Sequence, residues 1–331
     1  MKIAFPKSII LSNLPTPILP LKAGWAKNSG ISIWIKRDDL TGLEVSGNKV
    51  RKLEFLLNDA IQQEATHILT CGSVQSNHCR TAAFMAVKLG LKPVLFLKDL
   101  RRRAGIPAGN LLLNKLLQSD IIPVTAREYE QIDALMAEQA ADLQVKGKRG
   151  YCIPEGGSNH LGIWGYIKCF AEILTQIRDQ SLPIDTVMVA TGSGGTHAGL
   201  LLGKLLFESS LQIVSINVCN NADFCRRKIM GIIRDFKDHY GYGCSCSDND
   251  IAVIDGFVGR GYGLLDQAEI RVIKEFARQE GIILDPVYTA KAVLGMQTLL
   301  QKGLLVSKNI LFVHTGGIFS IFPYAADLFR Q

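Results

Sequence analysis

Short apolar runs alternate with helical periods along most of this chain, and this alternation constrains its fold more than any other feature. A strand, a helix and a second parallel strand form the repeating unit of α/β folds. The sequence therefore predicts an α/β fold in which the strands run parallel. The expected strands are residues 65–72, 93–97, 121–124, 186–191, 211–218 and 309–314, and the expected helices are residues 77–89, 111–118 and 196–207.

Length and charge narrow the possible partners. The chain has 331 residues, more than one hydrophobic core usually organises, so we expect two lobes. The formal net charge of +7 suits an anionic cofactor or substrate but is too diffuse for a nucleic-acid surface. We interpret the dense run Arg101, Arg102 and Arg103 as a solvated loop. No apolar stretch of the sequence approaches the roughly 18 residues that cross a membrane, so we expect no membrane partner.

The N-terminus and the cysteines indicate a cytoplasmic protein. Residues 1–14 lack both a long apolar region and a small-residue cleavage site. Eight cysteines are scattered along the chain without a Cys-x-x-Cys pair. Cys244 and Cys246 flank one serine, but no matching Cys or His pair follows at zinc-site spacing, so we expect no metal. Free thiols fit a reducing compartment.

Small polar loops follow three of the expected strands, at residues 72–78, 191–196 and 315–317. Ligands of open α/β sheets bind beyond the carboxyl ends of the strands. Three such loops therefore predict one convergent site. The stretch at residues 156–158 is the best candidate for a crossing between two lobes.

The loop at residues 191–196 has the composition of a phosphate site. Glycines let a backbone fold closely around an anion, and the following helix offers free N–H groups. No Gly-Lys-Ser/Thr ending is present, and no carboxylate ends the next strand, so a phosphate monoester is favoured over a nucleotide. A glycine-rich helix entry without a ligand is the alternative. The loop consists of Thr191, Gly192, Ser193, Gly194, Gly195 and Thr196.

A lysine begins the helix that follows residues 46–48. At about 100° per residue, Lys49 falls on the apolar stripe, Lys52 falls at its flank and Arg51 points away. Burial and a helix N-terminus both lower the pKa of an amine, which favours a neutral, nucleophilic Lys49. The structural alternative is a lysine that buries only its stem. The stripe consists of Leu53, Leu56, Leu57 and Ala60.

A buried lysine combined with a monophosphate loop points to pyridoxal 5′-phosphate as the cofactor. The loop containing Ser76, Asn77 and His78 then offers backbone N–H groups for a substrate carboxylate. Asn77 and Asn48 are candidates for contact with the phenolic oxygen of the cofactor. The alternative for Ser76 is a plain helix N-cap.

Five short motifs lie at residues 13–18, 47–54, 75–78, 262–264 and 285–288. They resemble, in the same order, those of the pyridoxal-phosphate family that groups 1-aminocyclopropane-1-carboxylate (ACC) deaminases with D-cysteine desulfhydrases. The resemblance spans nearly the whole chain.

The resemblance implies two open, mostly parallel sheets with flanking helices, as in the tryptophan synthase β group (fold-type II). It implies a small domain, residues 52–160, inserted into a large domain formed by residues 1–51 and 161–331, and a homodimer. Lys49 would be the lysine that carries the cofactor, and loop 191–196 would hold the phosphate. Ser76, Asn77 and His78 would bind the substrate carboxylate and the cofactor oxygen.

Two tyrosines also take roles from the resemblance. Tyr288 would lie against the cofactor ring and the substrate, and Tyr262 would point into the pocket. Without the resemblance, both would be interpreted as half-buried core aromatics.

Two threonines favour the desulfhydrases within this family. Thr289 follows the 285–288 motif, where the deaminases carry glutamate, and Thr315 stands where they carry leucine. We expect Thr289 to bind substrate and Thr315 to contact the pyridine nitrogen, and His78 also fits the desulfhydrase loop. A hydroxyl near the pyridine nitrogen makes the cofactor a weaker electron sink than a carboxylate would. A weaker sink suffices for an elimination in which a thiolate leaves.

The predicted reaction is α,β-elimination on D-cysteine or a related β-substituted amino acid, which yields pyruvate, ammonia and hydrogen sulfide. Released Lys49 would remove the α-proton. Glu155 and the segment 99–109 depart from the desulfhydrase pattern, which leaves the leaving group open. The alternatives are an ACC deaminase that yields 2-oxobutyrate, a nucleotide-dependent oxidoreductase and a non-catalytic binder of pyridoxal phosphate.

Overall fold

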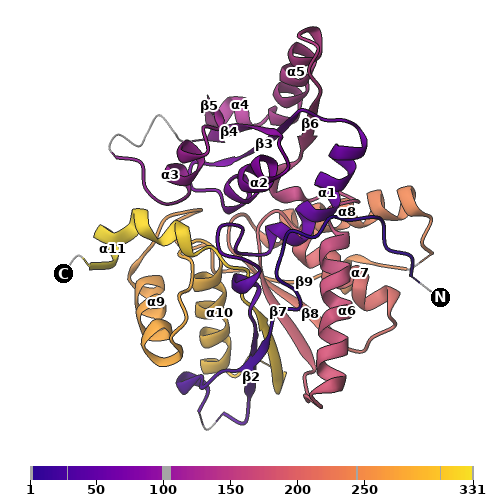
Figure 1. Ribbon diagram of the computed structural model, residues 1–331. Coiled ribbons are helices and arrows are strands. Elements are labelled where there is room, and N and C mark those ends of the chain that lie inside the picture. The colour runs from indigo at the N-terminus through magenta and orange to yellow at the C-terminus, as the bar shows by residue number, and fades with distance from the viewer. Residues whose placement is uncertain (1–2, 28, 99–105, 244, 306, 330–331) are drawn as a thin grey trace.

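The computed structural model describes residues 3–27, 29–98, 106–243, 245–305 and 307–329, and Figure 1 shows two lobes, each built on its own sheet. The three arginines at 101–103 lie outside the described residues. One lobe holds a four-stranded sheet and the other a six-stranded sheet. The fold confirms the expected α/β class with mostly parallel strands.

The four-stranded sheet has the order β5-β4-β3-β6 and is parallel throughout. Its strands come from within the segment that the sequence predicts to be an inserted domain. They are β3 (His67–Ser73), β4 (Lys92–Lys98), β5 (Asp120–Val124) and β6 (Gly150–Ile153). The helices of this lobe are α2 (Asn77–Lys88), α3 (Gly109–Leu116), α4 (Ala126–Tyr129) and α5 (Ile132–Val145).

The six-stranded sheet has the order β1-β2-β10-β7-β8-β9, and only the β1–β2 pair is antiparallel. Its strands are β1 (Ile18–Pro20), β2 (Ser32–Lys36), β7 (Thr186–Thr191), β8 (Gln212–Asn217), β9 (Ala252–Ile254) and β10 (Asn309–Val313). The helices of this lobe are α6 (Trp164–Asp179), α7 (Gly195–Leu206), α8 (Ala222–Tyr240), α9 (Gln267–Glu280), α10 (Thr289–Gln301) and α11 (Ala325–Phe329). Short 3₁₀ turns lie at Gly24–Ala26, Asp38–Leu40, Glu155–Gly157, Asp248–Asp250 and Ile318–Tyr324.

Helix α1 (Lys49–Gln62) lies between the two lobes (Figure 1). The apolar stripe predicted from its sequence is buried, since Leu53, Leu56, Leu57 and Ala60 are all inaccessible to solvent. The domain division expected from the resemblance places a boundary between residues 51 and 52, and that position falls inside this continuous helix. The domain limits therefore stay a prediction.

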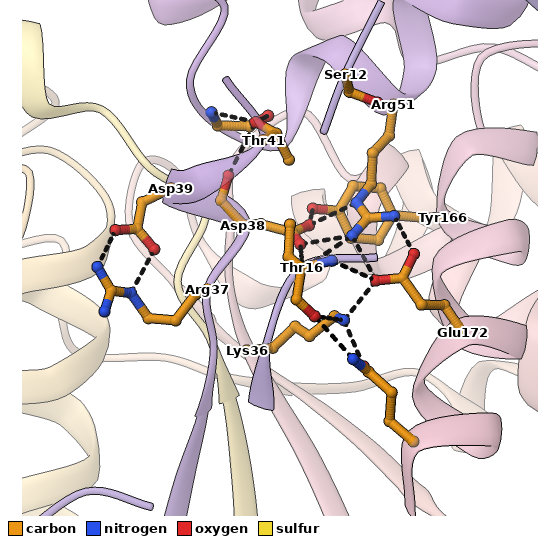
Figure 2. Close-up of polar contacts among 12 residues, drawn as sticks. Ser12, Thr16, Lys36, Arg37, Asp38, Asp39, Thr41, Arg51, Tyr166 and Glu172 are labelled. Atoms are coloured by element: carbon orange, nitrogen blue, oxygen red, sulfur yellow. Dashed lines mark hydrogen bonds and ion pairs between the residues drawn. The ribbon is translucent and has the colours of Figure 1, made fainter. Parts of the chain in front are cut away.

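The sequence predicts that Arg51 points away from the apolar stripe, and the structure shows that this side of α1 is buried as well. Arg51 is 1% exposed, and its guanidinium contacts Asp38 at 2.7 Å and Glu172 at 2.9 Å (Figure 2). Helix α6 covers this side of α1 and supplies Glu172 and Tyr166, and the Tyr166 hydroxyl donates to Asp38 at 2.6 Å. An apolar periodicity cannot predict a face that is buried by ion pairs.

Candidate active site

The three polar loops predicted from the sequence meet in one pocket. The pocket has a volume of about 290 Å³, and its wall includes residues that follow β3, β7 and β10 and the start of α1. Among the expected site residues, Gly195 and Thr289 are absent from the wall that the structure describes. The expected residues in the wall are Asn48, Lys49, Ser76, Asn77, His78, Thr191, Gly192, Ser193, Gly194, Thr196, Tyr262, Tyr288 and Thr315.

Lys49 presents its amine to this pocket without a partner. The amine makes no hydrogen bond or ion pair with any residue in the described part of the chain. Burial lowers the pKa of Lys49 to about 8, although the negative charges of Glu155 and Asp285 oppose that change. A substantial neutral fraction at mildly alkaline pH makes this amine a nucleophile.

The loop before Lys49 is tied to the loop after β10. The Asn48 backbone N–H donates to the Thr315 carbonyl at 3.1 Å. Gly47 has φ +114°, and a Cβ there would lie 2.8 Å from the same carbonyl oxygen. Only glycine fits this close approach. The two loops therefore place Lys49 and the Thr315 side chain in the same pocket.

The N-terminus of α7 forms a cradle for an anion. Gly194 has φ +82°, and no side chain caps the helix, so its first N–H groups lack intrahelical acceptors. Asn48 Nδ2 donates to Thr196 Oγ1 at 3.0 Å, and the hydroxyls of Ser193 and Ser158 lie 2.9 Å apart. A helix N-terminus of this kind favours a phosphate group.

Lys52 is a functional candidate that the sequence pattern placed only at the flank of the apolar stripe. Its buried amine donates to the Gly156 carbonyl at 3.2 Å and to Ser158 Oγ at 3.1 Å. A Cβ added to Gly195 would lie 2.6 Å from that amine, so Lys52 adjoins the cradle. Burial, with added repulsion from Lys49 and Lys228, holds the pKa of Lys52 well below its usual range.

An anion in the cradle would offset the free-energy cost of burying a protonated Lys52 amine. Lys52 forms no ion pair with a carboxylate in the described part of the chain. Its spacing of three residues from Lys49 on one helix is the sequence signal that would have singled it out.

The start of α2 offers a second anion site. Ser76 is the N-cap of α2, and its Oγ accepts a hydrogen bond from the Cys79 N–H at 3.1 Å. This is the N-cap role given as the alternative for Ser76 in the sequence analysis. The N–H groups of Asn77 and His78 open the helix and have no intrahelical acceptor. Asn110 Nδ2 donates to Asn77 Oδ1 at 2.8 Å, which fixes the orientation of the Asn77 amide.

His78 contributes to the anion site through its backbone N–H at the start of α2 and not through its imidazole ring. Its Nε2 lies 2.8 Å from Thr70 Oγ1, and its buried Nδ1 has no partner among the residues described. Burial, together with the charges of Lys49 and Lys52, holds the pKa of His78 well below its usual range, so the ring is neutral.

The two predicted tyrosines form a pair in the pocket wall. Their hydroxyls lie 2.6 Å apart, and their rings meet edge to face at 5.8 Å between centroids. Burial raises the pKa of Tyr288 well above its usual range, so its hydroxyl keeps its proton. Tyr288 itself is held by the Asp285 carboxylate, which accepts the Tyr288 N–H at 3.1 Å.

Thr289 does not reach the pocket wall. Its hydroxyl donates to Asp285 Oδ1 at 2.8 Å and accepts the Asp285 N–H at 2.7 Å, and its side chain is fully buried. The turn at the start of α10 uses both groups to close itself. The structure therefore shows a structural contact for Thr289, and its contact with substrate stays a prediction.

A second group of side chains lies at the mouth of the pocket. Tyr129 donates to Glu155 at 2.8 Å, and the Lys228 amine lies 3.4 Å from the other carboxylate oxygen. The Lys98 amine lies 4.8 Å from the centre of the Tyr129 ring. Except for Glu155, these residues were missed by the sequence analysis, because they come from β4, α4 and α8 and share no motif.

Comparison with known proteins identifies the family. A family model described as pyridoxal-phosphate dependent enzyme matches residues 9–316. The chain belongs to this family. A Thermotoga maritima protein provisionally named a 1-aminocyclopropane-1-carboxylate deaminase is 43% identical over 321 residues, which cover 97% of this chain and 99% of the relative.

Two further matches agree with this assignment. An Arabidopsis thaliana mitochondrial protein named a bifunctional D-cysteine desulfhydrase/1-aminocyclopropane-1-carboxylate deaminase is 38% identical over 322 residues, covering 94% of this chain and 78% of the relative. A crystal structure described as an ACC deaminase homologue has a TM-score of 0.88 at 35% identity, covering 98% of this chain and 95% of that chain. These matches confirm the resemblance inferred from the motifs, and they favour pyridoxal phosphate over a nucleotide.

The residues of the pocket fit this cofactor. Lys49 supplies an unpartnered amine for the aldehyde carbon, and the start of α7 supplies N–H groups for the phosphate. Lys52 supplies a buried amine that has no carboxylate partner among the described residues and that a bound phosphate would keep protonated. Pyridoxal phosphate would therefore provide partners for groups that have none in the protein alone.

No helix in the part of the chain that the structure describes is long and apolar enough to cross a membrane. No group of three or more His, Cys, Asp and Glu side chains is arranged to hold a metal ion in the same residues. The seven cysteines described are all free thiols.

Proposed function

We propose that this enzyme catalyses α,β-elimination on D-cysteine or a related β-substituted amino acid. With D-cysteine, one substrate molecule and one water give pyruvate, ammonia and hydrogen sulfide. The observation that carries the proposal is the Thr315 hydroxyl in the pocket wall, which makes no hydrogen bond to a described residue. A hydroxyl beside the pyridine nitrogen suits a reaction in which a thiolate leaves readily.

The carboxylates of the pocket support the same assignment. Asp285 is buried, and its oxygens accept the N–H groups of Val287, Tyr288 and Thr289. Glu155 is the only carboxylate among the described residues of the wall, and it lies with Tyr129 at the mouth. No described carboxylate is therefore available to strengthen the electron sink, which opening a cyclopropane ring demands.

When bound, the cofactor supplies the electron sink that stabilises negative charge at the substrate α-carbon. Lys49 is the base we assign to the α-proton, which would move from that carbon to Lys49 Nζ. A pKa of about 8 suits this role, because the amine gains and loses a proton near neutral pH.

The other groups orient the substrate. The N–H groups at the start of α2 would bind the substrate carboxylate, with the Asn77 amide beside them. Tyr288 keeps its proton and can therefore donate to a departing sulfur, and Tyr262 orients it through the hydrogen bond between the two hydroxyls. Glycine loop 191–196 and Lys52 would hold the phosphate.

ACC deamination is the second candidate. The name of the Thermotoga maritima relative favours it, and the name of the Arabidopsis thaliana relative gives both activities. The deciding experiment supplies the purified holoenzyme with D-cysteine and with ACC in parallel. We expect sulfide and pyruvate from D-cysteine at a higher kcat/KM than 2-oxobutyrate from ACC. A higher kcat/KM for ACC would make the enzyme a deaminase, and no turnover with any amino acid would make it a binder of the cofactor.

We further propose a cytoplasmic homodimer. The free thiols of the seven described cysteines support a reducing compartment. Light scattering of the holoenzyme should give twice the mass of the chain, and a monomer mass would contradict the assignment.

A further inference from the structure

The Glu155 carboxylate is held in a defined position at the pocket mouth. It stands on the turn Glu155–Gly157 between β6 and α6, where the chain passes from one sheet to the other. Tyr129 from the four-stranded lobe donates to one oxygen at 2.8 Å. Lys228 on α8 of the other lobe approaches the second oxygen at 3.4 Å. The negative charge is therefore fixed from both sides of the cleft.

Glu155 offsets part of the positive charge of the pocket wall. The other charged side chains in the described pocket wall are Lys49, Lys98 and Lys228, all of which are cationic. The negative charge of Glu155 also acts on the interior, since it raises the pKa of Lys49 against the larger effect of burial. Without Glu155, the positive charge of the wall would be larger, and a ligand with additional negative charge would be favoured more strongly.

The proposed function gives the substrate one carboxylate, and the start of α2 can bind it. A second carboxylate, on the substrate side chain, would enter the field of Glu155. We propose that Glu155 is a specificity-determining residue that selects against amino acids with an acidic side chain relative to those with a neutral or cationic one. This inference rests on the proposed function in so far as an amino acid is the ligand.

A purely structural role for Glu155 is the competing explanation. In that case the Glu155–Lys228 ion pair would act as a latch between the lobes. The two side chains are 46% and 35% exposed, and exposed ion pairs contribute little to stability. Substitutions of Glu155 and Lys228 separate the two explanations, because an electrostatic role predicts opposite shifts in ligand preference and a latch predicts the same loss of binding in both variants.

The test uses D-asparagine and D-aspartate, which have nearly the same shape and differ by one charge. Each is titrated into the holoenzyme, together with its L enantiomer, and binding is followed by the absorption of the bound cofactor. We expect the native enzyme to bind asparagine more tightly. Glu155→Gln should shift the ratio of the two dissociation constants towards aspartate by about three- to tenfold, as one removed charge in a polar site predicts.

Lys228→Met should shift the same ratio in the opposite direction, because it leaves Glu155 uncompensated. A latch would instead make both variants bind both ligands more weakly, with no change in the ratio. Glu155→Asp keeps the charge and should restore much of the native ratio. Glu64→Gln is the matched control, since Glu64 forms an exposed ion pair with Arg149 at 3.3 Å and does not line this pocket.

An unchanged ratio in Glu155→Gln, with the cofactor spectrum still responding to both ligands, would overturn the inference and leave the proposed function intact. The expected shift without turnover of D-cysteine would support the inference and overturn the proposed reaction. If no amino acid alters the spectrum of any variant, both are overturned.

Discussion

The Arg51 guanidinium contacts the Asp38 carboxylate at 2.7 Å, and both side chains are almost fully buried. Arg51 lies two residues after Lys49, the lysine on which the site depends. The contact ties α1 to the turn that follows β2. Arg51 also contacts Glu172, which in turn pairs with Lys36 (Figure 2). Burial alone would raise the pKa of Asp38, but the Arg51 charge and hydrogen bond hold it below the usual range.

Replacing Arg51 should therefore destabilise the fold. Arg51→Met leaves Asp38 buried without its main partner, and we expect a loss of about 3–5 kcal/mol in the free energy of unfolding. Urea unfolding of the native protein and the variant measures this difference. Arg178→Met is the matched control, because Arg178 forms an exposed pair with Asp179 and should change stability by less than about 1 kcal/mol. Equal effects of the two substitutions would contradict the role of the buried pair.

Lys52 should determine affinity for the cofactor. Lys52→Met removes the buried charge beside the cradle, and we expect the dissociation constant for pyridoxal phosphate to rise about 10- to 100-fold, the value of a charge-assisted hydrogen bond. The apoprotein should not lose stability, since burial disfavours the charged amine in the absence of an anion. Lys88→Met, on the partly exposed end of α2, is the control. Unaltered cofactor affinity would show that Lys52 does not contact the phosphate.

The Lys49 amine should react with acetic anhydride at a lower pH than an ordinary lysine, because its pKa is lowered. Burial lowers its pKa to about 8, so the amine is mostly protonated below that pH and mostly neutral above it. Acetylation of the apoprotein with limiting acetic anhydride, followed by peptide mapping, gives the rate at each lysine as a function of pH. We expect the Lys49 rate to rise with a midpoint about two pH units below that of an ordinary lysine. A midpoint close to the usual value of about 10.4 would contradict the burial argument.

Stability of the apoprotein should respond to the same pKa. The folded value of Lys49 lies below the unfolded value, so the unfolded chain binds more protons between pH 8 and the usual pKa of about 10.4. The contribution of Lys49 to the free energy of unfolding therefore rises with pH in that interval. Lys49→Met should remove this part of the pH dependence.

Substitution of Thr315 should lower activity, whereas substitution of Thr289 should lower stability. Thr315→Val removes a hydroxyl from the pocket wall, and we expect kcat for D-cysteine to fall about tenfold or more while unfolding is little changed. Thr289→Val removes a buried hydroxyl that bonds Asp285, which should cost about 1–3 kcal/mol in the free energy of unfolding. The same kcat effect in both variants would remove the basis for assigning Thr315 to the pyridine nitrogen.

The convergence of the site could be predicted from the sequence because its signals are local. A polar loop after an apolar run marks the carboxyl end of a strand, and parallel strands bring such ends to one edge. Lys49 and the glycine loop 191–196 carry their chemistry in short segments, so both were found before the fold was known.

The remaining features depend on contacts between distant segments. Arg51 was predicted to point away from the apolar stripe, but no periodicity reveals that α6 covers that side and supplies Glu172. Thr289 was expected in the pocket because a motif gives its position but not the direction of its hydroxyl, which bonds Asp285. The Tyr129–Glu155–Lys228 group joins three elements and has no local signal.

The most direct test of the account is to identify the residue that carries the cofactor. The protein is loaded with pyridoxal phosphate, reduced with sodium borohydride, digested and mapped by mass spectrometry. We predict that the reduced cofactor is attached to Lys49 and that Lys49→Ala shows neither the attachment nor turnover. A cofactor attached only to other lysines, or full activity of Lys49→Ala, would contradict the account.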